Sequence, residues 1–219
     1  MGLFGKKSKN KNALPEVYDD ADFNAVEAHI TKYFGSSENV FHEIASPDIH
    51  VDIYICDPTE ERPYITLVTH GMGAHRMKVP KELGKYRIDR MELMINLPKD
   101  WDINNEDEKW YWPIRWLKTL ARLPIEHDTW LGHYHTVPSG GPLADNNNFV
   151  CIMLTLPYLH DVDAVFCELP SGDRVLFYQM TPLYESEMNF KIENDAEDLE
   201  ELFGDELPGV LDLNRKRVV

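Results

Sequence analysis

The sequence contains no apolar run of the roughly twenty residues that a membrane-spanning helix needs. Its N-terminus carries charge without a following apolar stretch, so we expect neither a membrane span nor a secretion signal. Cysteine is scarce as well: Cys56, Cys151 and Cys167 are an odd number at wide spacings, and none belongs to a CxxC pair. This pattern argues against a disulfide framework and against a catalytic thiol, and it favours the reducing cytoplasm.

Basic residues are also few, with 22 Lys and Arg against 38 Asp and Glu, and the net charge is −16. This charge disfavours binding to nucleic acid, whose phosphates need Lys and Arg, and it permits a basic protein partner. Eleven carboxylates lie between residues 181 and 213, against the single base Lys191. Since Leu199, Leu202 and Phe203 give this region a helix with an apolar face, we expect a structured acidic surface.

What the sequence does contain is enough apolar material for a large core. Hydrophobic residues make up 43% of the chain, and its length of 219 residues favours one domain over two. The predicted organisation is a disordered basic tail over residues 1–14, a folded domain over 15–213 and a frayed basic terminus over 214–219.

Helix and strand patterns alternate in the first half of the chain. A helix capped by Asp20 or Asp22 is expected to end at Gly35 and to cover a sheet face. Its apolar residues are Phe23, Val26, Ile30 and Phe34. Strand patterns follow over residues 40–44, 51–56, 64–69 and 90–98. In the second and fourth of these, polar and apolar residues alternate as in half-buried strands, which would leave Asp52 and Glu92 facing solvent.

The second half begins with an amphipathic helix, predicted from about Trp112 to Pro124. A loop over residues 129–148 follows, because Gly, Pro and Asn are concentrated there. Further strands are predicted at 149–156, 164–169 and 175–180, with a hairpin turn at 170–173, and two short helices complete the domain.

Four histidines in two loops raise the possibility of a metal-dependent enzyme, since imidazoles from separate loops can bind one divalent ion. These are His70, His75, His133 and His135. The last two, at positions i and i+2, would share one face of a strand, whereas the first two are five residues apart and no HExxH motif occurs. No nucleophile motif is present either, and Arg76 breaks a GxGxxG pattern after Gly71. We therefore predict no catalytic residue, no metal and no cofactor, and keep the metal-dependent enzyme as an alternative.

The same two loops are the predicted contact surface for a partner protein. Trp130 and Tyr134 lie in the second loop, and large aromatic residues are enriched at binding hot spots. The mode of binding that we expect is capture of a strand at a sheet edge. The full set of predicted partner-binding residues is His70, Met72, His75, Trp130, His133, Tyr134 and His135.

Several segments between Val40 and Phe203 occur in an order that resembles the suppressor of fused domain family. They are His50–Ile53, Tyr64–Gly73, Met91–Pro98 with Trp101, Trp112–Pro113 with Trp116, Leu117, Leu120 and Ala121, Gly132–Thr136, and Thr181–Tyr184. Each segment alone is weak, whereas the ordered combination is specific. The resemblance implies an α+β fold, with a single compact domain in which a mixed β-sheet is flanked by helices, similar to the N-terminal lobe of the family.

The resemblance also implies a function. The animal member has an additional C-terminal lobe and holds a peptide of a zinc-finger transcription factor between its lobes, whereas this chain is similar to the short bacterial form. Bacterial relatives are associated with contact-dependent toxin systems, in which they act as immunity proteins.

The resulting prediction is a non-catalytic protein-binding domain in the cytoplasm, with no nucleic-acid or membrane partner. In its specific form it is an immunity protein that neutralises a cognate toxin. If that toxin is basic, the acidic surface between Glu185 and Glu206 would steer it, and otherwise the surface is merely solvated. The alternatives are the metal-dependent enzyme and a structural subunit or adaptor.

Overall fold

A computed structural model of the protein describes residues 14–204 and 208–219. Most of the predicted N-terminal tail lies outside the described residues. The described strands form one mixed sheet with the order β1-β2-β3-β4-β8-β6-β5, in which β4 and β8 are parallel and the other neighbours are antiparallel. β7 forms an antiparallel hairpin with the start of β8. The strands are β1 (Asn39–Phe41), β2 (Asp52–Cys56), β3 (Tyr64–His70), β4 (Met91–Pro98), β5 (Thr136–Pro138), β6 (Cys151–Thr155), β7 (Phe166–Glu168) and β8 (Arg174–Leu183).

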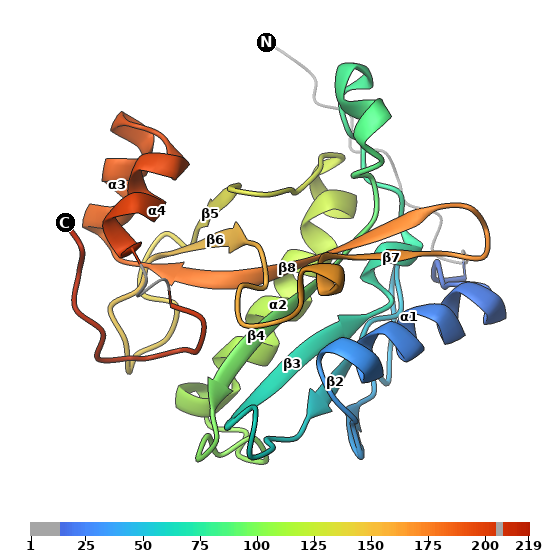
Figure 1. Ribbon diagram of the computed structural model, residues 1–219, viewed down its shortest axis with the longest axis horizontal. Coiled ribbons are helices and arrows are strands. Elements are labelled where there is room, and N and C mark those ends of the chain that lie inside the picture. The colour runs from blue at the N-terminus through green and yellow to red at the C-terminus, as the bar shows by residue number, and fades with distance from the viewer. Residues whose placement is uncertain (1–13, 205–207) are drawn as a thin grey trace, which may run out of the picture.

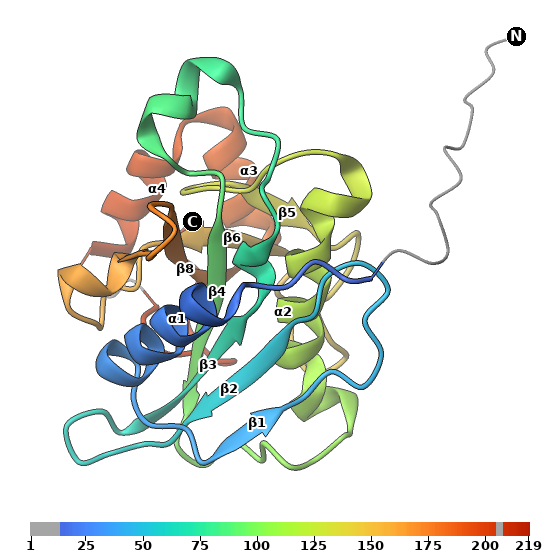
Figure 2. The same cartoon turned by 90° about the vertical axis from the view of Figure 1, so that its right-hand side faces the viewer.

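Helices cover both faces of this sheet, which gives three layers (Figures 1 and 2). α1 (Asp20–Tyr33) packs on one face, and α3 (Glu185–Glu193) and α4 (Ala196–Phe203) pack on the same face farther along β8. α2 (Glu108–His127) covers the opposite face. The 3-10 helices are η1 (Met72–Ala74), η2 (Lys81–Tyr86) and η3 (Val162–Val165). The predicted α+β fold, a mixed sheet flanked by helices, is confirmed. Within the described ranges, no helix is both long and apolar enough to cross a bilayer.

α1 forms close to its predicted position. The carboxylate of Asp19, one residue before the predicted caps, accepts the N–H groups of Ala21 and Asp22 at 3.0 and 2.9 Å. Val26 and Ile30 are buried against the sheet as expected. Phe23, which was predicted on the buried side, is 37% exposed because it lies at the margin of the helix contact.

α2 is longer than the prediction at both ends, and it contains Pro113 and Pro124. A proline inside a helix removes the N–H that would bond to the carbonyl four residues earlier. For Pro113 that carbonyl belongs to Lys109, and the side-chain amide of Asn146 donates to it at 3.0 Å. A residue from the following loop thus satisfies the group that the proline leaves free, and the helix begins at Glu108.

The predicted solvent faces of β2 and β4 are wrong. Every residue of β2 is buried, and so is every residue of β4 before Pro98. Asp52 is 7% exposed because it is bound by His42 and the N–H of Glu43, at 3.0 and 2.9 Å, and Glu92 is 0% exposed beneath Tyr18 and the turn after β3.

The C-terminal residues, predicted to fray, make specific contacts instead. The guanidinium of Arg215 forms a salt bridge with the buried carboxylate of Glu187. The carbonyl of Arg215 accepts the hydroxyl of Tyr184 at 2.8 Å, and Ser186 donates to the carbonyl of Val219 at 2.8 Å. The end of the chain is therefore part of the folded domain.

Candidate protein-binding surface

The first predicted loop follows β3, and the side chain of Glu92 in β4 bonds to its main chain. This carboxylate of β4 is fully buried and accepts five hydrogen bonds. The donors are the hydroxyls of Tyr18 and Thr69, at 2.8 and 2.5 Å, and the N–H groups of Gly71, Met72 and Gly73, at 2.9, 3.2 and 3.0 Å. Burial raises the pKa of Glu92, while the hydrogen bonds act in the opposite direction. Glu92 fixes the turn, and sequence reasoning missed it because the alternation of β4 assigned it to solvent.

Gly71 is required where this turn begins. Its φ is +124°, in the region that favours glycine, and a Cβ atom at this position would lie 2.0 Å from the carbonyl oxygen of His50. The chain can therefore turn sharply enough for three successive N–H groups to approach one carboxylate.

Two of the predicted partner-binding residues in this loop do not face solvent. His70 is 2% exposed, and its ring packs edge-on against Phe23 with a centroid separation of 4.2 Å. Met72 is 3% exposed and belongs to the core on the α2 side. The side chain of His75 is partly exposed, and its Nδ1 lies 2.9 Å from the carboxylate of Glu16. His70 and Met72 are therefore core residues, and their side chains do not lie on the predicted partner-binding surface.

The second predicted loop forms an aromatic cluster whose members are half-buried. Trp130 and His135 pack edge to face at 4.2 Å between centroids, and His133 stacks on Tyr134 at 3.7 Å. Tyr134 has a left-handed backbone with φ of 63°, which is uncommon for a residue with a side chain. Its hydroxyl donates to Glu200 of α4, as does that of Tyr158. This clamp fixes the loop against α4 across a large distance in sequence.

Burial disfavours the charged form of the histidines in this cluster. Burial lowers the pKa of both His133 and His135. Nε2 of His133 is buried and has no hydrogen-bond partner within the part of the chain that the structure describes. This nitrogen is therefore an unsatisfied polar atom inside the cluster, which a partner could not reach without a movement of the loop.

The two loops lie side by side. The N–H of Lys78 donates to the carbonyl of Thr129 at 3.3 Å, and the N–H of Leu131 approaches the sulfur of Met77 at 3.4 Å. The four histidines nevertheless have separate surroundings. In residues 14–204 and 208–219, no group of three His, Cys, Asp or Glu side chains is placed to hold a metal ion. The alternative of a metal-dependent enzyme built on His70, His75, His133 and His135 therefore lacks its site.

Next to the aromatic cluster lies β5, the last strand of the sheet, which pairs only with β6 among the described strands. The sequence had placed this stretch in a loop. The carbonyl of His135 accepts the N–H of Leu154 in β6, and the N–H of Ser139 donates to the carbonyl of Val150, just before β6, at 2.9 Å each. Since main-chain groups alternate in direction along an antiparallel strand, those of Thr136 and Pro138 point away from β6. Proline has no N–H, so Thr136 supplies the outward donor of this edge.

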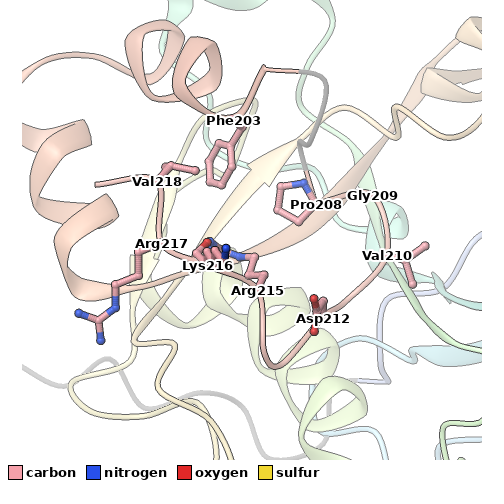
Figure 3. A pocket seen from close by; sticks show the side chains of 9 residues that line it. All are labelled: Phe203, Pro208, Gly209, Val210, Asp212, Arg215, Lys216, Arg217 and Val218. Atoms are coloured by element: carbon pink, nitrogen blue, oxygen red, sulfur yellow. The ribbon is translucent and has the colours of Figure 1, made fainter.

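A separate cavity of about 650 Å³ lies between the end of α4 and the C-terminal segment (Figure 3). Arg215 is part of its lining, but the guanidinium of this residue is already bound to Glu187. The other lining residues are Phe203, Pro208, Gly209, Val210, Asp212, Lys216, Arg217 and Val218. The cavity lies where the C-terminal segment crosses β4 and β8, and none of its lining residues belongs to β5.

Comparisons with known proteins agree with this architecture. A crystal structure of a SUFU homologue from Neisseria gonorrhoeae has a TM-score of 0.63 and 22% identity, and the match covers 91% of this chain and 97% of that one. The Sufu–Fu complex gives a TM-score of 0.64 with 12% identity, over 94% of this chain and 93% of that one. Drosophila Suppressor of Fused gives 0.58 with 12% identity, over 93% of this chain and 52% of that one. At these identities the likeness shows the fold.

Sequence comparison identifies the family. An uncharacterised protein of Ureaplasma parvum serovar 3 is 25% identical over 153 residues, which are 70% of this chain and 73% of that protein. The model of the family described as suppressor of fused protein (SUFU) matches residues 47–216. This match includes the motifs from His50 to Tyr184 on which the resemblance rested, and it spans most of the chain. The chain therefore belongs to the suppressor of fused family.

Proposed function

We propose that this chain is a non-catalytic protein-binding domain that holds an extended segment of another protein against the outer edge of β5. The observation that carries the proposal is the combination of a sheet edge that no other described strand pairs with and an adjoining aromatic cluster. Added strands gain affinity from main-chain hydrogen bonds and specificity from neighbouring side-chain pockets. Thr136 offers the hydrogen bonds, and Trp130, His133, Tyr134 and His135 form the adjoining surface. The Sufu–Fu complex, a protein of this fold bound to another protein, supports a protein partner.

The cysteines support a role without covalent catalysis. Burial raises the pKa of Cys56 and of Cys151 to about 12, and that of Cys167 to about 11. Since the thiolate is the nucleophile, none of these thiols is reactive at neutral pH. All three are free thiols, which supports the proposed cytoplasmic location.

In its specific form, the proposal is an immunity protein whose partner is a basic toxin. The support is electrostatic: α3 and α4 carry a row of exposed carboxylates next to the Tyr134–Glu200 clamp. They are Glu185, Glu193, Glu197, Asp198 and Glu201. Such a surface raises the association rate of a cationic partner and makes that rate sensitive to salt.

The test uses the polypeptide encoded by the reading frame directly before this gene, purified and titrated calorimetrically with the full chain. Thr136→Pro removes the outward N–H of β5, while its matched control Thr136→Val keeps it. Loss of one main-chain hydrogen bond and the bulk of the ring should weaken binding about tenfold or more in the proline variant. Equal affinity of both variants would refute capture at β5, and failure of the polypeptide to bind the unmodified chain would refute this partner.

A second experiment tests whether the partner is basic, independently of whether it binds at β5. Glu197→Gln with Glu201→Gln should slow association at low salt if the partner is basic, and it should leave dissociation unchanged. The matched control is Glu60→Gln with Glu61→Gln, two exposed carboxylates in the β2–β3 turn. An association rate that does not respond to the α4 variant argues against a basic partner, even where the Thr136 result holds.

A further inference from the structure

The segment between Pro80 and Arg87 stands out from the body of the protein as the green projection at the top of Figures 1 and 2. Its centre is η2, none of whose residues is buried. Tyr86 is 54% exposed. We call residues 80–87 the finger. It contributes nothing to the hydrophobic core, so its order must come from contacts at its base.

Ion pairs with the β7–β8 hairpin hold that base. Arg76 binds Asp89 at 2.6 Å and also binds Asp173, so that it joins both legs of the loop to the hairpin. Arg90 binds Asp173 at 3.2 Å and donates to the carbonyl of Gly73 at 2.8 Å. These contacts fix where the finger leaves the sheet.

Arg87 ends η2 in a left-handed conformation, with φ of 54° and ψ of 49°. Its guanidinium binds Glu168 at 2.9 Å and the carbonyl of Gly172 at 2.7 Å. A left-handed residue with a side chain persists only where its surroundings hold it, and such residues concentrate at functional sites. The finger is thus a fixed projection whose one arginine, Arg87, is bound within the protein.

The lysines of the finger are not engaged in this way. Residues 80–87 hold three Lys and Arg against one Glu, a net charge of +2 in a chain whose total is −16. Lys78 is paired with Asp128. Lys81 and Lys85 are exposed, and within the described residues neither has a carboxylate at salt-bridge distance; Lys85 lies 4.8 Å from the ring of Tyr86. The tip therefore presents two lysines without a salt-bridge partner among the described residues, the exposed carboxylate of Glu82 and an aromatic ring.

We propose that the finger is a second interaction element, which binds an acidic segment of a partner protein. Lys81 and Lys85 pair with carboxylates of that segment, and the ring of Tyr86 packs on its aliphatic carbons. The negative charge of the rest of the domain favours a short acidic segment over other polyanions. An extended polyanion such as a duplex or an anionic bilayer would bring further negative charge against the acidic surface of the domain, whereas a short acidic segment ends at the finger. The proposal does not depend on capture at β5.

The test is an NMR titration of the isotope-labelled full chain with acetylated octaglutamate, and with an uncharged glutamine-serine peptide of equal length as the blank. We expect saturable shifts of the amides of residues 81–86 with octaglutamate alone, lost at high salt. Lys81→Gln with Lys85→Gln should weaken the affinity about tenfold. The matched control, Lys99→Gln with Lys216→Gln, removes two exposed lysines elsewhere and should leave the affinity unchanged.

Three results would overturn the proposal: no shift at millimolar peptide, shifts centred outside the finger, or equal weakening in the control variant. Phosphatidylserine vesicles and a short single-stranded DNA are titrated in parallel. Tighter binding of either, dependent on Lys81 and Lys85, would assign the finger to a membrane or a nucleic acid and refute an acidic protein segment. Because no residue of η2 is buried, the variants should unfold at the same temperature as the unmodified chain, which excludes loss of folding as the cause.

Discussion

Replacing Arg215 with methionine should destabilise the domain by about 3–5 kcal/mol, the usual cost of breaking a buried ion pair from one side. The guanidinium of Arg215 binds both carboxylate oxygens of Glu187, at 2.6 and 2.5 Å, and the side chain of Glu187 is 0% exposed. It also donates to the carbonyl of Pro182 at 2.9 Å and lies 4.6 Å from the ring centroid of Tyr184. Methionine keeps the apolar stem but removes every donor, so Glu187 is left as a buried charge.

Urea unfolding followed by tryptophan fluorescence measures this loss. Arg217→Met is the matched control, because Arg217 lies over the same Tyr184 ring at 5.0 Å but is exposed; its cost should stay below about 1 kcal/mol. Glu187→Gln combined with Arg215→Met should recover part of the stability, since the uncompensated charge is then absent. The reasoning fails if Arg215→Met unfolds within about 1 kcal/mol of the unmodified chain, or if deletion of residues 214–219 has no effect, as a frayed terminus would require.

Three further predictions concern buried polar groups and the turn after β3. Burial lowers the pKa of His160 to about 4, so between about pH 6.5 and pH 4 the unfolded chain binds a proton at His160 that the folded chain does not bind. The free energy of unfolding should therefore decrease by up to about 3 kcal/mol over this range. Urea unfolding at several pH values should show a smaller decrease in His160→Phe. An unchanged slope in that variant would contradict the assignment. Gly71→Ala should lower the free energy of unfolding by about 3 kcal/mol or more, because of the positive φ and the nearby carbonyl of His50. Gly84→Ala is the control and should have no effect in thermal unfolding, since the space around Gly84 is open. Equal effects of the two variants would be inconsistent with the turn geometry. Glu92→Gln places an amide donor among five donors and should cost about 2–3 kcal/mol, and a stable variant would show that the turn does not need the carboxylate.

The sequence predicts those elements whose determinants are local. Val26 and Ile30 recur at helical spacing, and both are buried under α1. The hairpin at residues 170–173 follows from Pro, Gly and Asp, and the N–H of Leu169 indeed donates to the carbonyl of Asp173 at 2.8 Å. In each case the residues that determine the structure lie within one or two turns of one another, so their spacing is sufficient information.

The candidate surface depends on contacts between distant segments, and the sequence could therefore locate only part of it. The aromatic residues of the second loop were identifiable from their type, but β5 itself is three residues long and is fixed by pairing with β6 across a Gly- and Asn-rich loop. Tyr134 is held by Glu200, 66 positions away. His70 and Met72 were assigned to the surface because a Gly-rich loop is usually exposed, whereas Glu92 draws this one inward. The sequence of the loop itself contains no pattern that would predict its hydrogen bonds to Glu92.

The polar residues of the central strands explain why alternation misleads in this fold. A sheet covered on both faces should consist of continuous apolar runs, yet β4 and β8 retain polar side chains that are fully covered. Asn96 donates to the carbonyl of Gly209 at 2.8 Å, and Gln179 donates to that of Pro208 at 2.9 Å. Both carbonyls belong to the C-terminal segment, which has no helix or strand where it crosses the sheet, and Glu92 likewise bonds the main chain of the tight turn at Gly71. Such a segment cannot satisfy its own N–H and carbonyl groups once water is excluded, so the strand beneath must supply partners. In these strands the polar positions of an alternating pattern therefore mark where an irregular segment crosses the sheet, not where the sheet meets water.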